Sequence, residues 1–336
     1  MDFPGEKLVI KLWETVAEKG IGGLFRPWQM RREGRATIQL KQEELLAIAQ
    51  AERDADRIRR GEVVLETSRV PYLLAPPEPA PASGTGDTLH DLSPVQYANR
   101  FMISETMRHE ANVTRALLHA ETSLEDDPQS PPESSVSDDW LFRWRDSASQ
   151  VSAEELQYLW GRLLAGEIKS PGSYSLRTLE FLRNLSQREA EAIAKLSQFV
   201  VDTVIFRDAT ELLEKSGVTY GFLMNMQEIG VLAGVEAIGL SITWKSLAED
   251  KFTRALISNS MVLVVTADDP GISITLPAYQ LTEIGQQVLR LGKFVSNIEY
   301  LKKVGEHLKS QGTRVDLAQY VNISPDKIQY YNGQTL

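Results

Sequence analysis

Two stretches rich in proline and acidic residues limit how this chain can fold. Residues 75–87 contain four prolines and two glycines, and residues 125–139 contain three prolines and six acidic side chains. Neither composition can continue a helix interior or fill an apolar core. The sequence therefore predicts a Pro-rich linker at 75–87 and a solvated acidic loop at 125–139, with a helical segment at 88–124 between them.

Residues 1–74 are predicted to form an N-terminal helical region that mediates oligomerisation. Val9, Leu12 and Trp13 recur at the spacing of an amphipathic helix. Farther along, a highly charged stretch carries a thin apolar seam at near-heptad spacing. Such a narrow seam favours packing on a partner helix, as in a coiled coil, over burial in a deep core. The seam residues expected to mediate self-association are Ile38, Leu45, Ile48 and Ala55.

The segment that follows the first helix is unusually apolar and basic for a connection. Aromatic and leucine side chains lie beside arginines, a composition typical of segments that bind a membrane surface. The same side chains could instead pack on protein, and the sequence leaves both interpretations open. The candidate contact residues, for a protein partner or for lipid, are Leu24, Phe25, Arg26, Trp28, Arg31 and Arg32.

Residues 140–204 are predicted to form a cluster of short helices. Ser152 with Glu155, and Ser186 with Glu189, match the capping box that begins a helix. Trp160 and the leucines around it are expected to fill a core, and Gly161 is expected to let two helices approach closely. A structural role explains these residues without any catalytic chemistry.

Residues 205–336 are predicted to form a winged-helix-like domain followed by C-terminal helices. Two short helices precede a strand-like segment at 239–244. The apolar runs 261–266 and 272–276 flank the turn sequence 268–271, which predicts one β-hairpin. The expected fold class is therefore mainly α with a small α+β part: N-terminal amphipathic and coiled helices, a central helical cluster, and a C-terminal winged-helix-like segment.

No catalytic or cofactor motif stands out in the sequence. The chain has no cysteine, which excludes disulfides, thiolate metal sites and cysteine nucleophiles. His109 and His119 are ten residues apart on one predicted helix, a rise of about 15 Å, so they cannot ligate a single ion. Phosphate-binding glycine loops and the nucleophile-elbow pattern are absent from the sequence. We therefore expect no metal, no cofactor and no enzymatic activity.

The charge distribution argues against nucleic acid as a partner. The net charge is −10, and residues 71–140 alone contribute 3 − 12 = −9. The helix that would read DNA in a winged helix, around 222–232, has no basic residue, and the turn of the proposed wing carries Asp268 and Asp269. Such a surface repels phosphate, so contacts with protein are the better expectation.

Three segments carry a family resemblance: Trp140–Trp144, Gln157–Leu179 and Leu185–Ser186. They resemble an uncharacterised bacterial family known as domain of unknown function 2806. The helical core is also similar to the abortive-infection alpha family of phage-defence proteins. These resemblances imply a bacterial cytoplasmic protein in a defence or mobile-element setting, and neither implies catalytic residues.

The sequence thus predicts a non-enzymatic interaction or regulatory protein that self-associates, as a sensor or accessory component of bacterial anti-phage defence. Its expected partners are further copies of itself and a protein from a neighbouring gene or a phage. The first alternative is a peripheral membrane effector that acts through residues 5–28. The second is an enzyme with an unrecognised site, such as a metal-dependent nuclease. Because the first residues lack the basic segment of a signal peptide, the expected location is cytoplasmic, or peripheral at the inner membrane under the first alternative.

Overall fold

The computed structural model describes residues 3–21, 50, 53–54, 56–57, 60, 94–237, 239–324 and 327–336. The chain divides into two compact units, Met1–Tyr174 and Ser175–Leu336, which we call the N-terminal unit and the C-terminal unit. The predicted Pro-rich linker at 75–87 lies outside the described residues. Within these ranges, no helix combines the length and the hydropathy needed to cross a membrane.

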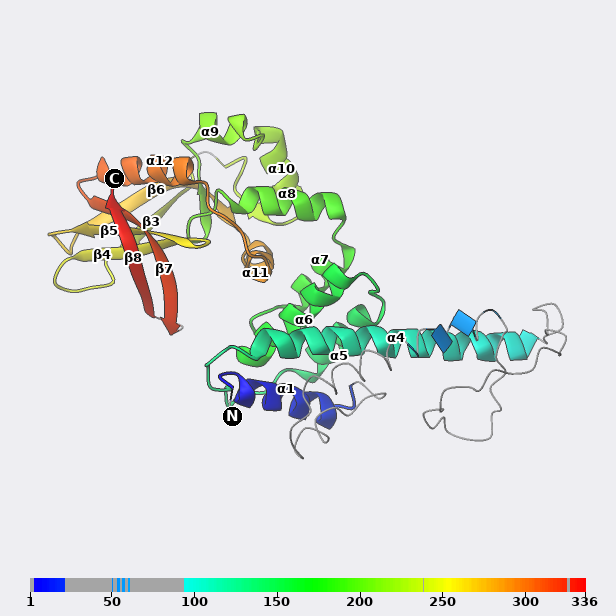
Figure 1. Cartoon of the computed structure of the whole chain (residues 1–336). Helices are drawn as coiled ribbons and strands as arrows, with labels where there is room; N and C mark the ends of the chain where they lie inside the picture. The colour runs from blue at the N-terminus through cyan, green and yellow to red at the C-terminus, as the bar shows by residue number, and fades with distance from the viewer. Residues whose placement is uncertain are drawn as a thin grey trace. The chain divides into compact units, whose positions relative to one another are not determined.

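The described part of the N-terminal unit is helical (Figure 1). Its helices are α1 (Glu6–Glu18), α4 (Pro94–Leu124), α5 (Asp138–Ser149) and α6 (Glu154–Lys169). Helix α4 packs against each of the other three helices. Pro94 is the first residue of α4, a position where proline is favoured because its missing N–H would have no intrahelical partner. The acidic stretch at 125–137 connects α4 to α5 without helix or strand.

The amphipathic α1 is confirmed, and its apolar face is occupied by protein. Leu8 and Leu12 are fully buried, and Val9, Trp13 and Val16 are nearly so. Helix α1 contacts α4 and α6 along this face. Just before α1, the amide of Gly5 donates a hydrogen bond of 2.9 Å to the carbonyl of Glu125. The start of the chain is therefore fastened to the C-terminal end of α4.

Helices α4 and α6 approach each other closely at Gly161, as the sequence predicted. A Cβ atom at Gly161 would lie 2.6 Å from the Cβ of His119 and 2.8 Å from the carbonyl oxygen of Ala116. The helices can therefore approach this closely only because position 161 has no side chain. The predicted capping box at Ser152 is wrong, since α6 begins at Glu154 and its N-cap Ala153 makes no side-chain bond.

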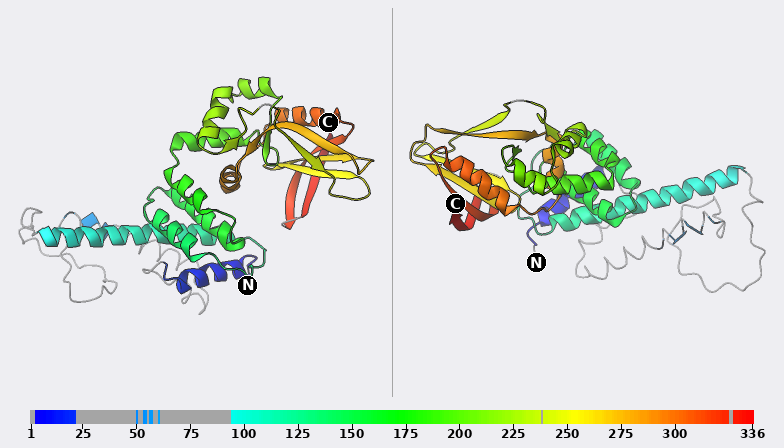
Figure 2. Two further views of the ribbon diagram at one scale, coloured as in Figure 1. Left: turned by 180° about the vertical axis from the view of Figure 1, so that it is seen from behind. Right: turned by 90° about the horizontal axis from the view of Figure 1, so that it is seen from above.

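The described residues of the C-terminal unit form six helices and two sheets (Figure 2). The helices are α7 (Leu176–Asn184), α8 (Gln187–Ser197), α9 (Thr210–Lys215), α10 (Tyr220–Glu228), α11 (Glu283–Leu291) and α12 (Ile298–Lys309). The capping box that begins α8 is confirmed, because Ser186 and Glu189 each bond the backbone N–H of the other. Helix α12 packs against strands of both sheets.

Each sheet has four antiparallel strands. In the first, β6 (Ser273–Leu281) pairs with β1 (Val204–Phe206), β2 (Leu232–Ala233) and β3 (Ser241–Lys245). The second has the order β4 (Phe252–Ser258), β5 (Met261–Ala267), β7 (Arg314–Ser324) and β8 (Lys327–Thr335). In this sheet Leu263 lies opposite Leu317, and Val262 lies opposite Ala318. All four side chains are buried, so the centre of the sheet is covered on both faces.

The predicted fold class is wrong, because the chain is a mixed α/β protein with two sheets where one hairpin was expected. The two strands of the predicted hairpin belong to different sheets: Met261 pairs with Ser258 and Gln319, whereas Ile274 pairs with Trp244. The turn at 268–271 therefore passes the chain from one sheet to the other. The buried strand 261–267 is hydrogen-bonded to a neighbouring strand along each of its two edges. A lone two-stranded hairpin cannot supply both neighbours. The predicted winged-helix-like domain required that hairpin as its wing, so this prediction is also wrong.

Candidate functional site

The predicted contact residues cannot be placed. The six candidates for partner or membrane contact, Leu24, Phe25, Arg26, Trp28, Arg31 and Arg32, all lie outside the described residues. The same holds for the predicted self-association seam, Ile38, Leu45, Ile48 and Ala55. Both sets stay predictions. Only α1 of the proposed membrane segment is described, and its apolar side chains are inside the N-terminal unit.

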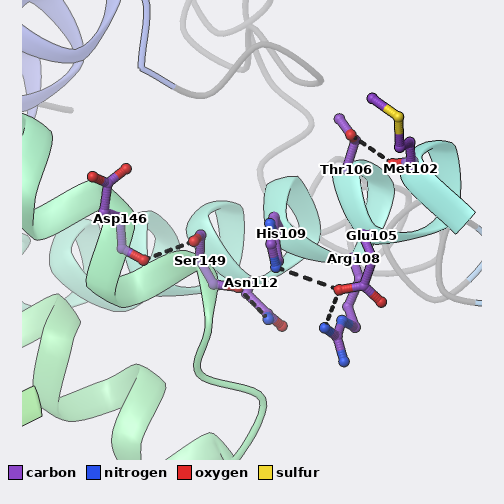
Figure 3. Close-up of polar contacts among 8 residues, drawn as sticks. All are labelled: Met102, Glu105, Thr106, Arg108, His109, Asn112, Asp146 and Ser149. Carbon is purple, nitrogen blue, oxygen red and sulfur yellow. Dashed lines mark hydrogen bonds and ion pairs between the residues drawn. The ribbon is translucent and has the colours of Figure 1, made fainter.

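The first concave site is a hollow of about 370 Å³ between α4 and α5. Figure 3 shows four of the lining residues, Thr106, His109, Asp146 and Ser149, together with neighbouring polar contacts on α4. Glu110 of α4 forms an ion pair with Arg145 of α5. His109 precedes Glu110 on α4, and its Nε2 lies 3.6 Å from the carboxylate of Glu105, one helical turn earlier. Glu105 also pairs with Arg108, so the acidic and basic groups at this hollow bind one another.

A buried amide network lies beneath this hollow. The Nδ2 of Asn112 donates a 2.7 Å hydrogen bond to the carbonyl of Ser149. The Nε2 of Gln157 bonds the Oδ1 of Asn112 at 3.3 Å and the carbonyl of Val151 at 3.0 Å. Buried amides of this kind must be satisfied, and here each one fastens α4 to the α5–α6 connection. The hollow is therefore best explained as part of the helix packing.

The histidines of the described residues serve packing. His119 packs edge-on against Tyr158 with ring centroids 5.6 Å apart, and burial lowers the pKa of its imidazole. His307 of α12 packs against Phe206, with ring centroids 4.8 Å apart. The described part of the chain contains no group of three or more acidic or histidine side chains arranged to hold a metal ion.

A buried carboxylate organises the end of α6. Glu167 is only 2% exposed, and its two oxygens accept hydrogen bonds from the amides of Gly172 at 2.6 Å and Tyr174 at 3.0 Å. Burial raises the pKa of Glu167, while these backbone bonds act in the opposite direction. The carbonyl of Tyr174 in turn accepts the indole N–H of Trp140 at 2.7 Å. Glu167 therefore shapes the turn after α6 and has a structural role.

The second concave site, which we call the C-terminal pocket, has a volume of about 680 Å³. It lies between two tight turns, Asp202–Thr203 and Asn259–Ser260, and the C-terminal end of α11. Tyr320 of β7 contributes to the wall beside the second turn. This volume is within the range of pockets that bind small organic ligands.

The two turns are fixed in position by hydrogen bonds. Asp202 and Asn259 adopt the left-handed conformation, with φ of 58° and 49°, which Asp and Asn tolerate better than most residues. The amide of Asp202 donates a 2.6 Å bond to the carbonyl of Ile257, which joins one turn to the other. The Tyr320 hydroxyl donates to the Asn259 carbonyl at 2.9 Å. The backbone on this side of the pocket is therefore rigid before any ligand arrives.

The opposite wall carries positive charge and an aromatic ring. Arg290 lies in the last turn of α11, and Lys293 follows the helix. Neither side chain makes an ion pair with the described residues. Phe294 folds back over Gly292 so closely that a Cβ there would lie 2.0 Å from the ring. The hydroxyl of Ser296 then donates a 2.5 Å bond to the carbonyl of Ser258 and anchors this segment.

Sequence reasoning did not identify the C-terminal pocket. Its lining comes from segments around residues 202, 259, 290 and 320, which are about 60, 30 and 30 residues apart along the chain. No local sequence motif includes two of these segments. The only acidic side chain in its lining, Asp202, accepts a 3.3 Å bond from the indole N–H of Trp244. The remaining polar groups are amides, hydroxyls and the two cations, so the pocket can bind and orient an anion.

Comparison with known proteins gives one match. Neither the curated proteins nor the solved structures that were searched contain a protein similar to this chain. The resemblance to the abortive-infection alpha family is unsupported. The family model described as "Protein of unknown function (DUF2806)" matches residues 96–305, which include the end of the N-terminal unit from α4 onward and most of the C-terminal unit. The resemblance of the tryptophan-rich segments is thereby confirmed, and the chain belongs to the DUF2806 family.

Proposed function

We propose that this chain is a non-enzymatic regulatory protein that binds a small ligand in the C-terminal pocket. The observation that carries this proposal is the pocket itself, about 680 Å³ in volume and walled by two turns that are hydrogen-bonded to each other. Preorganised walls reduce the entropy that a ligand must lose on binding. Apart from Asp202, the polar side chains of the lining are amides, hydroxyls and two cations, which can bind and orient a ligand.

Self-association through the N-terminal region remains part of the proposal. It rests on the sequence alone, namely the thin apolar seam that includes Ile38, Leu45 and Ile48. Light scattering of the full chain at tens of micromolar, an order-of-magnitude choice set against typical affinities, should give a mass above that of a 37.6 kDa monomer. The double variant Leu45→Glu/Ile48→Glu should lower that mass. A monomeric wild-type chain would remove self-association from the proposal and leave the pocket untouched.

Ligand binding is tested by thermal unfolding of the full chain against a panel of nucleotides, carboxylates, sugars and neutral aromatic compounds. A ligand that binds only the folded state raises Tm, and the increase grows with the ratio of the free ligand concentration to Kd. We expect at least one compound to raise Tm by several degrees. The variant Ser260→Trp, which places a bulky ring at the pocket, should abolish that shift.

The matched control for Ser260→Trp is Ser241→Trp. Both serines are exposed and both belong to the C-terminal unit, but Ser241 lies on β3 and does not line the pocket. The control should retain the ligand-induced shift. A panel in which no compound raises Tm, or a shift that survives Ser260→Trp, would contradict the proposed function.

A further inference from the structure

We infer that the ligand of the C-terminal pocket is a phosphate monoester that carries an aromatic ring, such as a nucleoside monophosphate. This inference rests on the proposed function, because it names the class of ligand for the same pocket. It is carried by three features of the lining: two cations on one wall, two aromatic rings, and amide and hydroxyl groups between them.

The two cations of the lining can both pair with a dianion. Arg290 and Lys293 both line the pocket, and neither forms an ion pair with the described residues. A phosphate monoester carries a charge of roughly −1.5 to −2 at pH 7, because its second pKa is about 6. Arginine and lysine together can neutralise that charge, and arginine can bind two phosphate oxygens at once.

The acidic side chain of the lining, Asp202, lowers the formal net charge of the lining to +1 but, among the described residues, pairs with neither cation. Asp202 accepts the indole N–H of Trp244 at 3.3 Å, and the 2.6 Å bond from its own amide to Ile257 fixes its backbone. No ion pair joins Asp202 to Arg290 or Lys293 in the described structure. The two cations are therefore not neutralised by the carboxylate closest to them in the lining.

Two aromatic side chains offer surfaces for a ring. Phe294 follows Lys293 directly in the chain, and both residues line the pocket. Tyr320 belongs to the wall of the second turn, and its hydroxyl is held by the carbonyl of Asn259. Burial raises the pKa of Tyr320, which keeps its phenol neutral near an anion. Bases stack on such rings in complexes of proteins with single-stranded nucleic acids.

A purely structural explanation of Arg290 also exists. A basic residue in the last turn of a helix is stabilised by the negative end of the helix dipole, and Arg183 in the last turn of α7 has that same position. Arg183 is exposed and does not line the pocket. It therefore provides a matched control, because substitution of either arginine removes the same helix-end interaction.

The experiment is isothermal titration of the full chain with adenosine 5′-monophosphate, phenyl phosphate, adenosine and inorganic phosphate. We expect adenosine 5′-monophosphate to bind at least about tenfold more tightly than adenosine or phosphate alone, since only it uses both walls. Arg290→Gln and Lys293→Gln should each weaken its binding by at least about tenfold, as expected when a charge-assisted hydrogen bond is lost. Arg183→Gln should leave it unchanged.

The outcomes separate this inference from the proposed function. If neither phosphate ester binds, or if adenosine binds as tightly as its monophosphate, the phosphate assignment is overturned. In that case the proposed function stands whenever another compound of the thermal panel binds and is blocked by Ser260→Trp. Equal losses in Arg290→Gln and Arg183→Gln would also overturn the inference, because the effect would then come from helix stability. Failure of every compound in both experiments would overturn both.

Discussion

The indole N–H of Trp144 donates a 2.9 Å hydrogen bond to the carbonyl oxygen of Trp160. Trp144 is fully buried on α5 and Trp160 is 2% exposed on α6, so this bond joins two helices inside the core of the N-terminal unit. A buried indole needs an acceptor for its N–H, and the geometry supplies one. The tryptophan-rich segments that identify the family therefore have a structural explanation.

Substitution of Trp144 tests this explanation. Trp144→Phe removes the indole donor of this buried bond, so we expect the free energy of unfolding to fall by about 2–4 kcal/mol from the lost bond and the smaller ring. Urea unfolding followed by circular dichroism measures the change. Phe142→Ala is the control on the same helix, because Phe142 is 49% exposed and should cost far less. Equal losses in the two variants would contradict the structural role of Trp144.

The close approach of α4 and α6 predicts that Gly161 cannot be replaced. The Cβ of Gly161→Ala would lie 2.8 Å from a backbone carbonyl of α4 and 2.6 Å from the Cβ of His119, and neither atom can move without shifting the helix. We expect a loss of about 1–3 kcal/mol, the usual cost of overpacking. Gly221→Ala in α10 meets no atom within 4 Å and should be neutral or stabilising. A neutral Gly161→Ala would show that the helices are farther apart than described.

The buried carboxyl of Glu167 predicts a pH dependence of stability. Burial raises the pKa of Glu167 above its ordinary value of 4.5. A group with a higher pKa in the folded state stabilises the fold below its unfolded pKa, and this contribution is lost as the pH rises through the folded pKa. The wild-type chain should therefore lose stability relative to Glu167→Gln as the pH rises from about 4.5 towards neutrality, measured by urea unfolding at a series of pH values.

A second carboxyl provides a control of opposite sign. Hydrogen bonds from the hydroxyl and amide of Ser186 lower the pKa of Glu189 below 4.5. Its contribution is therefore present above its unfolded pKa and lost as the pH falls through the folded pKa. Glu189→Gln should consequently differ from wild type most at neutral pH. If Glu167→Gln shows that same direction, the buried carboxyl of Glu167 is stabilised by its hydrogen bonds more than it is penalised by burial.

The ring of Phe294 predicts a variant that changes binding without unfolding the chain. In Gly292→Ala the new Cβ would lie 2.0 Å from the ring, and the ring can swing away because it is the far end of a side chain. We expect Tm to change by no more than a few degrees and the affinity for adenosine 5′-monophosphate to fall several-fold. Thermal unfolding and titration measure the two effects separately. Unchanged affinity would show that Phe294 does not contact the ligand.

The helices of this chain could be predicted from the sequence because their signals are local. The Ser186–Glu189 capping box and the position of Pro94 lie within a single helical turn of the residues that they organise. The β7 strand also carries a short local signal, because the apolar Val315 and Leu317 alternate with the polar Arg314 and Asp316, but alternation does not reveal which strand will pair with it. Pairing across about 50 residues depends on the assembled core, so one hairpin was predicted where two sheets form.

The C-terminal pocket could not be predicted for the same reason. Asp202, Asn259 and Arg290 are separated by dozens of residues, and the hydrogen bonds that bring the turns together exist only in the folded unit. Asn259 offered a weak local signal, since Asn is common in tight turns between strands. That signal predicts a turn, but it does not predict that the C-terminal end of α11 lies beside the turn.

Hydrogen–deuterium exchange of the full chain, with and without saturating adenosine 5′-monophosphate, tests most directly whether the C-terminal pocket is the functional site. Slower exchange is predicted in three segments that border the pocket: 200–203, 257–260 and 286–294. The hollow between α4 and α5, including 106–110 and 145–150, should exchange as before. Protection confined to that hollow, or no protection in any of the three pocket segments, would contradict the assignment of the ligand site to the C-terminal pocket.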